Sequence, residues 1–148
     1  MIDELNYDWD AFEIHDFVRA VADKVQRAIC VVPTLCAVEI AAVWVRTARY
    51  DFIFVRQTAS PVLQTHSILH ELGHIALGHH GYTMNDAQPN AVVKAIAASK
   101  SRIEDTPEEA QAERFAIEVS TKVQQARRAH LMATTAIPGL RPYIESGL

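Results

Sequence analysis

The stretch His70-Glu71-Leu72-Gly73-His74 has two histidines four residues apart with a glutamate between them, and it is the most informative part of this chain. Residues four apart on an α-helix lie one above the other on the same face, so the two imidazole rings can approach one metal ion from the same side. Glu71 is turned about a quarter of a circle away from His70, too far round to bind the same ion but near enough to reach a water molecule beside it. The stretch therefore indicates two metal ligands and a candidate base.

The residues on either side of this stretch predict a single core helix. Ser60 is a typical N-cap, Pro61 suits the first helical position, and Gly78 is a typical stop. The apolar residues between these signals are Ile68, Leu69, Leu72, Ile75, Ala76 and Leu77. Two histidines and a glutamate buried on such a helix are costly unless something such as a metal ion satisfies them.

The pattern H-E-x-x-H is typical of zinc peptidases, in which the histidines bind the ion and the glutamate is the base. The chain has seven histidines in 148 residues, so a pair at helical spacing can also arise by chance on a surface or in a core. The apolar surroundings of this pair favour a metal site.

A catalytic zinc ion usually has three protein ligands and one open position, so a third ligand is needed. His80 lies where the third histidine of the long metzincin motif would fall, but that motif needs glycine at position 77 and this chain has Leu77. His66 lies one turn before His70, and a column of three histidines on one helix places the outer residues roughly 12 Å apart. Neither histidine is favoured.

A carboxylate on a second helix is the third possibility, within Thr106-Pro107-Glu108-Glu109-Ala110-Gln111-Ala112-Glu113-Arg114-Phe115-Ala116. Threonine as N-cap and proline after it make a good helix start. Glu109 has a simpler interpretation as the capping-box glutamate, and Glu113 as a solvated residue paired with a nearby lysine or arginine. Spacing alone leaves both open as ligands.

These residues resemble the ImmA/IrrE family of bacterial and phage metallopeptidases, which have H-E-[IL]-[GS]-H and later E-x-x-A-[DNE]-x-F-A. The first pattern matches from His70 to His74, with the usual continuation to His79, and the second from Glu109 to Ala116. The match covers roughly Tyr50 to Ala116. It departs afterwards, because the family's apolar run ending in Met-Pro is replaced by Ile117-Glu118-Val119-Ser120-Thr121-Lys122.

The resemblance implies a Zn²⁺ site of His70, His74 and Glu109, with Glu71 as the catalytic base. It further implies an intracellular endopeptidase that cleaves a partner protein, typically a helix-turn-helix transcriptional repressor controlling a stress or mobile-element response. The alternative is a zinc-binding regulatory or toxin-antitoxin-type interaction protein with little or no turnover, against which the presence of Glu71 argues. A secreted metzincin-like protease using His80 is disfavoured by Leu77.

The expected fold is a single α+β domain over residues 1–148, mainly helical and similar to zincins. Apolar periodicity predicts a helix over about Trp9 to Ile29, capped by Asp8 or Asp10. Two runs, Ala42 to Thr47 and Asp51 to Arg56, predict a β-hairpin beside the motif helix, buried on both faces or with one edge binding an extended peptide.

The polar stretch from Gly81 to about Asp105 is a lid or a connector and has room for a short helix over Ala91 to Ala98. The tail from Ile137 is expected to be irregular. Four residues could donate to an oxyanion, although each is more simply a packing aromatic residue or a surface histidine: Tyr82, His79, His80 and Tyr143.

Composition favours a cytoplasmic protein that binds neither nucleic acid nor membranes. The net charge is −4, the basic run Arg127-Arg128-Ala129-His130 is short, and we expect it to be a solvated helix end. The sequence Met1-Ile2-Asp3-Glu4 is no signal peptide, and polar residues interrupt the apolar window from Ala28 to Val45. Cys30 and Cys36 are expected to be free buried thiols in a reducing compartment.

Overall fold

The computed structural model of the chain describes residues 1–35, 40–84 and 106–135. In chain order these form two 3₁₀ turns, η1 (Asp3–Leu5) and η2 (Trp9–Ala11), and then α1 (Ile14–Val25), β1 (Ala28–Thr34), β2 (Ala42–Arg46), β3 (Tyr50–Arg56), α2 (Pro61–Ala76), β4 (Tyr82–Thr83) and α4 (Pro107–Thr135). The predicted α+β class is confirmed.

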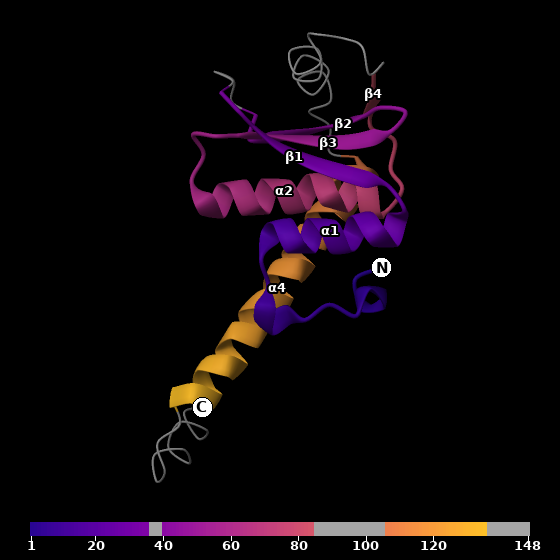
Figure 1. Cartoon of the computed structure of the whole chain (residues 1–148). Helices are drawn as coiled ribbons and strands as arrows, with labels where there is room; N and C mark the ends of the chain where they lie inside the picture. Colours follow the sequence, from indigo (N-terminus) through magenta and orange to yellow (C-terminus); the bar gives the residue numbers. More distant parts are fainter. Residues whose placement is uncertain (36–39, 85–105, 136–148) are drawn as a thin grey trace.

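The elements are arranged with α2 in the middle. Figure 1 shows the sheet on one side of α2, α1 beside it, and α4 passing behind α2 at an angle to it. The main core fills the space between these elements, with Phe17 of α1, Ile53 of β3, Leu72 of α2 and Val119 of α4 almost fully buried. The second half of α4 extends away from this core (Figure 1), and its residues from Arg127 to Thr134 are exposed.

The sheet has the strand order β1-β3-β2-β4. The predicted hairpin is confirmed, since β2 and β3 pair antiparallel with Arg46 opposite Asp51. β1 pairs parallel with β3, and the two residues of β4 pair parallel with Val45 and Arg46 of β2. Side chains of β2 alternate between two apolar clusters, with Trp44 in the main core and its neighbours Val43 and Val45 in a smaller cluster. The expectation of a sheet buried on both faces is therefore confirmed for β2.

The limits of α2 agree with the sequence signals. The Ser60 hydroxyl accepts a hydrogen bond from the backbone N–H of Leu63 at 3.2 Å, and Pro61 is the first helical residue. Gly78 follows the helix with φ of +71°, a left-handed conformation that glycine adopts without strain. Leu77 differs from the expectation, because its side chain is 41% exposed and does not join the core.

The predicted helix from Trp9 to Ile29 was too long at both ends. α1 begins at Ile14 because the Glu13 carboxylate accepts hydrogen bonds from the backbone N–H groups of His15 and Asp16. Asp8 caps η2 instead. Gln26 has a left-handed φ of +59° and ends α1, so Ile29 belongs to β1.

Several expectations concern residues outside the described ranges: the short helix at 91–98, the tail from 137, and Cys36. Cys30 is free but only half-buried, so the expectation of a buried thiol was wrong there. The run from Arg127 to His130 is exposed on α4, as expected, although the helix continues beyond it. Among the described residues no helix has the length and apolar character needed to cross a membrane.

Close packing of α2 against α4 depends on Gly73, which lies between the two motif histidines. A Cβ atom at this position would lie 3.1 Å from both the Ala112 carbonyl oxygen and the Phe115 Cβ atom. These contacts are tighter than ordinary van der Waals distances, and one of them is with helix backbone. Glycine therefore lets α4 approach the face of α2 that bears His70 and His74.

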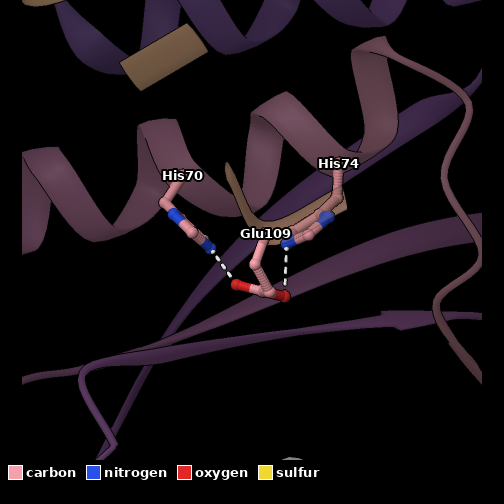
Figure 2. Close-up of side chains that lie close together, drawn as sticks. All are labelled: His70, His74 and Glu109. Atoms are coloured by element: carbon pink, nitrogen blue, oxygen red, sulfur yellow. Dashed lines mark hydrogen bonds and ion pairs between the residues drawn. The ribbon is translucent and has the colours of Figure 1, made fainter. Parts of the chain in front are cut away.

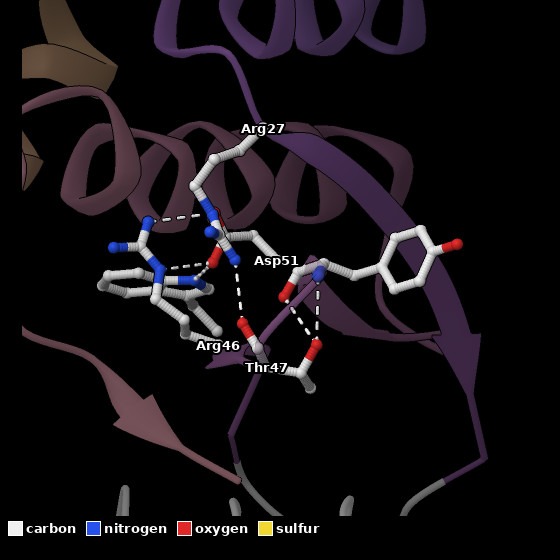
Figure 3. A network of polar contacts seen from close by, with 6 residues as sticks. Arg27, Arg46, Thr47 and Asp51 are labelled. Carbon is white, nitrogen blue, oxygen red and sulfur yellow. Dashed lines mark hydrogen bonds and ion pairs between the residues drawn. The ribbon is translucent and has the colours of Figure 1, made fainter. Parts of the chain in front are cut away.

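A buried carboxylate holds the sheet to the end of α1. Asp51 is fully buried, and Figure 3 shows it with Arg27 and Arg46. The Arg46 guanidinium donates two hydrogen bonds to it, at 2.7 and 2.9 Å, Arg27 Nε donates at 2.8 Å and Trp44 Nε1 at 3.0 Å. Although burial acts to raise the pKa of Asp51, these donors outweigh it and hold the pKa below its ordinary value of 3.8.

We expect Asp51→Asn to lower the free energy of unfolding by about 3 kcal/mol near neutral pH, because two guanidinium groups lose their shared buried partner. The folded-state pKa of Asp51 is lowered, so its stabilisation is present above pH 3.8 and is lost as the pH falls through the folded-state value. The difference between the two proteins should therefore shrink below that pH. Urea unfolding across pH measures this, with the exposed Asp23→Asn as control, and an equal difference at all pH values would contradict it.

We expect Gly73→Val to destabilise the fold by about 1–3 kcal/mol, because the added methyl groups push against the backbone of α4. The matched control is Ala129→Val, which puts the same β-branched side chain at an exposed position of α4. Thermal unfolding of the two variants separates overpacking from helix propensity. Equal unfolding temperatures for both would refute the close-approach role of Gly73.

Candidate metal site

Three predicted residues meet where α2 crosses α4. His70 and His74 project from successive turns of α2, and the Glu109 carboxylate from the first turn of α4 lies between their rings (Figure 2). His70 Nε2 is 2.9 Å from one carboxylate oxygen, and His74 Nε2 is 3.1 Å from the other. One ligand atom from each residue lies within 4.8 Å of the others, a spacing at which a single ion can contact all three.

Glu109 takes part in the helix cap through its backbone, whereas its side chain lies in the three-residue cluster. Its N–H group donates to the Thr106 hydroxyl at 3.2 Å, as expected for a helix N-terminus. Its carboxylate contacts the two histidines. The N-terminal end of a helix is also where the backbone dipole favours negative charge.

Glu113, which spacing had left open as a ligand, lies behind His70. Its carboxylate oxygens are 3.0 Å from His70 Nδ1 and 2.9 Å from His66 Nε2. Its side chain is partly exposed to solvent, as expected, but the expected lysine or arginine partner was wrong, because two histidines take that place. Glu113 is one helical turn after Glu109, so the same helix face that presents the first carboxylate to one ring nitrogen presents the second carboxylate to the other.

The position of His79 was also misjudged, because it is buried, with 7% exposed, and not a surface histidine. Its backbone N–H donates to the His74 carbonyl oxygen at 2.9 Å, and Gly78 N–H donates to the Ile75 carbonyl oxygen at 3.2 Å. This pair of bonds is the Schellman motif, which brings the second residue past the helix end back over the last turn. The glycine stop was visible in the sequence, and the motif it allows could have placed His79.

His79 links the second ring of the site to α4. Its Nδ1 is 2.9 Å from His74 Nδ1, and its Nε2 is 2.7 Å from Gln111 Oε1. Both His70 and His74 thus direct Nε2 toward Glu109 and Nδ1 toward a polar partner on the other side of the ring. Among the described residues that are not exposed, no buried side-chain nitrogen or oxygen lacks a hydrogen-bond partner.

Trp44 forms a wall beside His74. The two rings stack with centroids 6.2 Å apart and an angle of 15° between their planes. Trp44 is itself held by its hydrogen bond to Asp51, by the guanidinium of Arg46 at 5.1 Å from its ring, and by the close approach of Gly81. The Trp44 indole therefore connects the buried charge network of the sheet to the candidate site.

The two histidines differ in pKa. Burial acts to lower the pKa of His70, but Glu71, Glu113 and Glu109 outweigh it and raise the pKa above 6.5. The pKa of His74 is lowered to about 4, chiefly by burial, with Glu109 opposing and the charges of His70 and His79 adding to the shift. Burial thus favours the neutral form of His74, whereas the carboxylates around His70 favour a positive charge at that ring, which a metal ion can also supply.

The other described residues that the sequence suggested as a third ligand, a base or an oxyanion donor lie outside the three-residue cluster. The side chain of His80 is 99% exposed, and His66 contacts Glu113 instead of the three-residue cluster. Glu71 is half-buried beside His70, and its charge is one cause of the raised pKa of that ring. Tyr82 is half-buried on β4, and Tyr143 lies outside the described residues.

Comparison of the chain with models of protein families, with curated proteins and with solved structures found no match. The geometry of the site itself consists of two imidazole nitrogens and one carboxylate facing one point and a polar partner at the far side of each ring. Glu71, next to His70 in α2, adds a second carboxylate whose charge raises the pKa of His70.

Proposed function

We propose that this chain is a zinc-dependent endopeptidase that uses His70, His74 and Glu109 as ligands and Glu71 as general base. The observation that supports this most strongly is the convergence of the three ligand atoms within 4.8 Å, from two helices far apart in the sequence. The resemblance to the ImmA/IrrE family selects the same three ligands by an independent route and adds Glu71 as the base.

The donor set suits zinc better than the common alternatives. Two imidazole nitrogens and one carboxylate oxygen form the ligand set of catalytic zinc sites that keep one position open. Magnesium and calcium prefer sites made of oxygen atoms. The partners behind the rings, Glu113 and His79, are also of the kind that orient zinc-binding histidines.

When bound, a zinc ion would lower the pKa of a water molecule toward neutrality and polarise the scissile carbonyl group. Glu71 lies on α2 immediately after a ligand, turned about 100° around the helix from it. At that position its carboxylate would accept a proton from the attacking water and return it to the leaving amine. A site with a purely structural ion has no need for this base.

The substrate we propose is a partner protein, with a helix-turn-helix repressor as the class that the family resemblance implies. The edge of β2 offers a place where an extended segment of this partner protein could pair. β4 pairs with Val45 and Arg46, so within the described residues the part of β2 from Ala42 to Trp44 has no partner on that side. Because Trp44 stacks on His74, a peptide added to this edge would pass close to the ligands.

The net charge of −4 supports a protein substrate over direct binding to nucleic acid. A cytoplasmic location, where such repressors act, belongs to the same proposal.

We expect the unaltered chain to retain a zinc ion through dialysis, and His70→Ala and Glu109→Ala to lose it, because each removes one of three ligands. Glu113→Ala should still bind zinc, with an affinity about 10 to 100 times weaker, because it removes only the partner of a ligand. Metal analysis and chelator competition measure both effects, with His80→Ala as the control. Loss of zinc in Glu113→Ala together with retention in Glu109→Ala would show that the wrong glutamate has been assigned.

We expect Glu71→Gln to keep its zinc and its fold and to lose cleavage of the partner repressor by a factor of about 10² to 10⁴, the usual contribution of a general base. The matched control is Glu118→Gln, an identical change at an exposed position of α4. Cleavage is followed by mass spectrometry with helix-turn-helix regulators encoded beside this gene. Full biological activity in Glu71→Gln would exclude the peptidase and leave a zinc-binding interaction protein.

A further inference from the structure

We propose that His79 and Gln111 are positioning residues, which hold the His74 ring in the one tautomer that can bind a metal ion through Nε2. The proposal rests on the zinc site described above and goes beyond it, because neither residue contacts the three ligand atoms. It is based on an uninterrupted series of short contacts, from His74 through His79 to Gln111.

A neutral imidazole has one N–H donor and one acceptor nitrogen. For His74 Nε2 to bind an ion, the proton of this ring must be on Nδ1, from which it donates to His79 Nδ1, 2.9 Å away. His79 must then accept on Nδ1 and keep its own proton on Nε2. That proton is donated to Gln111 Oε1, at 2.7 Å. An acceptor at the far end of the series therefore leaves a lone pair at the metal end.

The opposite polarity would prevent metal binding at this ring. If the amide N–H of Gln111 donated to His79 Nε2, His79 would carry its proton on Nδ1 and donate it to His74 Nδ1. The proton of His74 would then be on Nε2, facing Glu109 at 3.1 Å. The whole series has only these two polarities when both rings are neutral, so the choice made at Gln111 decides the state of His74.

The two ligand histidines differ in how their tautomers are set. His70 Nδ1 faces the carboxylate of Glu113. When ionised, this carboxylate can accept a hydrogen bond but cannot donate one, so it directly favours a proton on Nδ1 of His70. His74 is 8% exposed and has a second histidine as its partner, which can accept or donate. A further residue is therefore needed to set the direction, and Gln111 is the residue in contact.

The surroundings keep these rings in contact. The Schellman motif at Gly78 positions the backbone of His79 over the end of α2. Trp44 stacks on His74, the other ring of the pair. Gln111 is two residues after Glu109 on α4. The helix that supplies the third ligand thus also supplies the residue that orients the second, and this links ligand geometry to tautomer.

The first test is zinc affinity, measured by chelator competition with the full chain. We expect His79→Leu to bind zinc about 10 to 100 times more weakly, because His74 Nδ1 loses its acceptor. His79→Asn should recover much of the loss, since its amide oxygen can take the place of the ring acceptor. The control is His80→Leu, at the adjacent, 99% exposed side chain, for which we expect no change. Equal affinities for His79→Leu and the unaltered chain would overturn the proposal.

The second test changes the exposed residue Gln111, which avoids disturbing the core. Gln111→Met removes the acceptor while keeping the length of the side chain, and it should weaken zinc binding in the same direction as His79→Leu. Gln111→Glu supplies only acceptor oxygens and should not weaken it. If Gln111→Met binds zinc as tightly as the unaltered chain, Gln111 has no part in orienting His74.

The third test is a spectroscopic signature that a merely structural role would not produce. Imidazole ¹⁵N–¹H correlation spectra of the zinc-loaded chain should show His74 protonated on Nδ1 and His79 protonated on Nε2. His79 protonated on Nδ1 would overturn the proposal while leaving the zinc site intact. Failure of the unaltered chain to bind zinc would overturn both this proposal and the proposed function.

Discussion

The close approach of α4 to α2 at Gly73 is the constraint on which the rest of the site depends. A Cβ atom at position 73 would lie 3.1 Å from the backbone of Ala112, so a residue larger than glycine there would require a shift of α4. That helix supplies the Glu109 carboxylate, whose oxygens lie 2.9 and 3.1 Å from the two ring nitrogens. Because a hydrogen bond or a metal bond tolerates only small displacements, a shift of α4 would separate the three candidate ligands.

Polar groups in and around the core are arranged in layers that support one another. The rings of His70 and His74 face Glu109 on one side, and on the other they contact Glu113 and His79 respectively. Trp44, stacked on the face of the His74 ring, connects the site to the buried carboxylate of Asp51, to which two arginines donate hydrogen bonds. Since an unpaired buried polar group is costly, each layer depends on the next being in place. The Trp44 indole is therefore one route by which the stability of the sheet affects the geometry of the site.

Local signals predicted the elements that make the site. Ser60, Pro61 and Gly78 correctly delimited α2, Thr106 and Pro107 correctly began α4, and the apolar runs correctly predicted the β2–β3 hairpin. These features depend on capping and on backbone preferences within a few residues, which sequence contains directly. The same approach extended α1 too far, because both its ends depend on particular residues, Glu13 as an N-cap and Gln26 in a left-handed conformation.

By itself the sequence determined that two histidines and a glutamate share one helix, and it left the third ligand undecided until a family resemblance selected Glu109. Tertiary structure decided which atoms meet, because the contacts at the site join residues about forty positions apart and depend on how two helices cross. The same crossing places Glu113 behind His70, and the turn at Gly78 places His79 behind His74. Helical spacing places residues within one element, but distances between elements come only from packing.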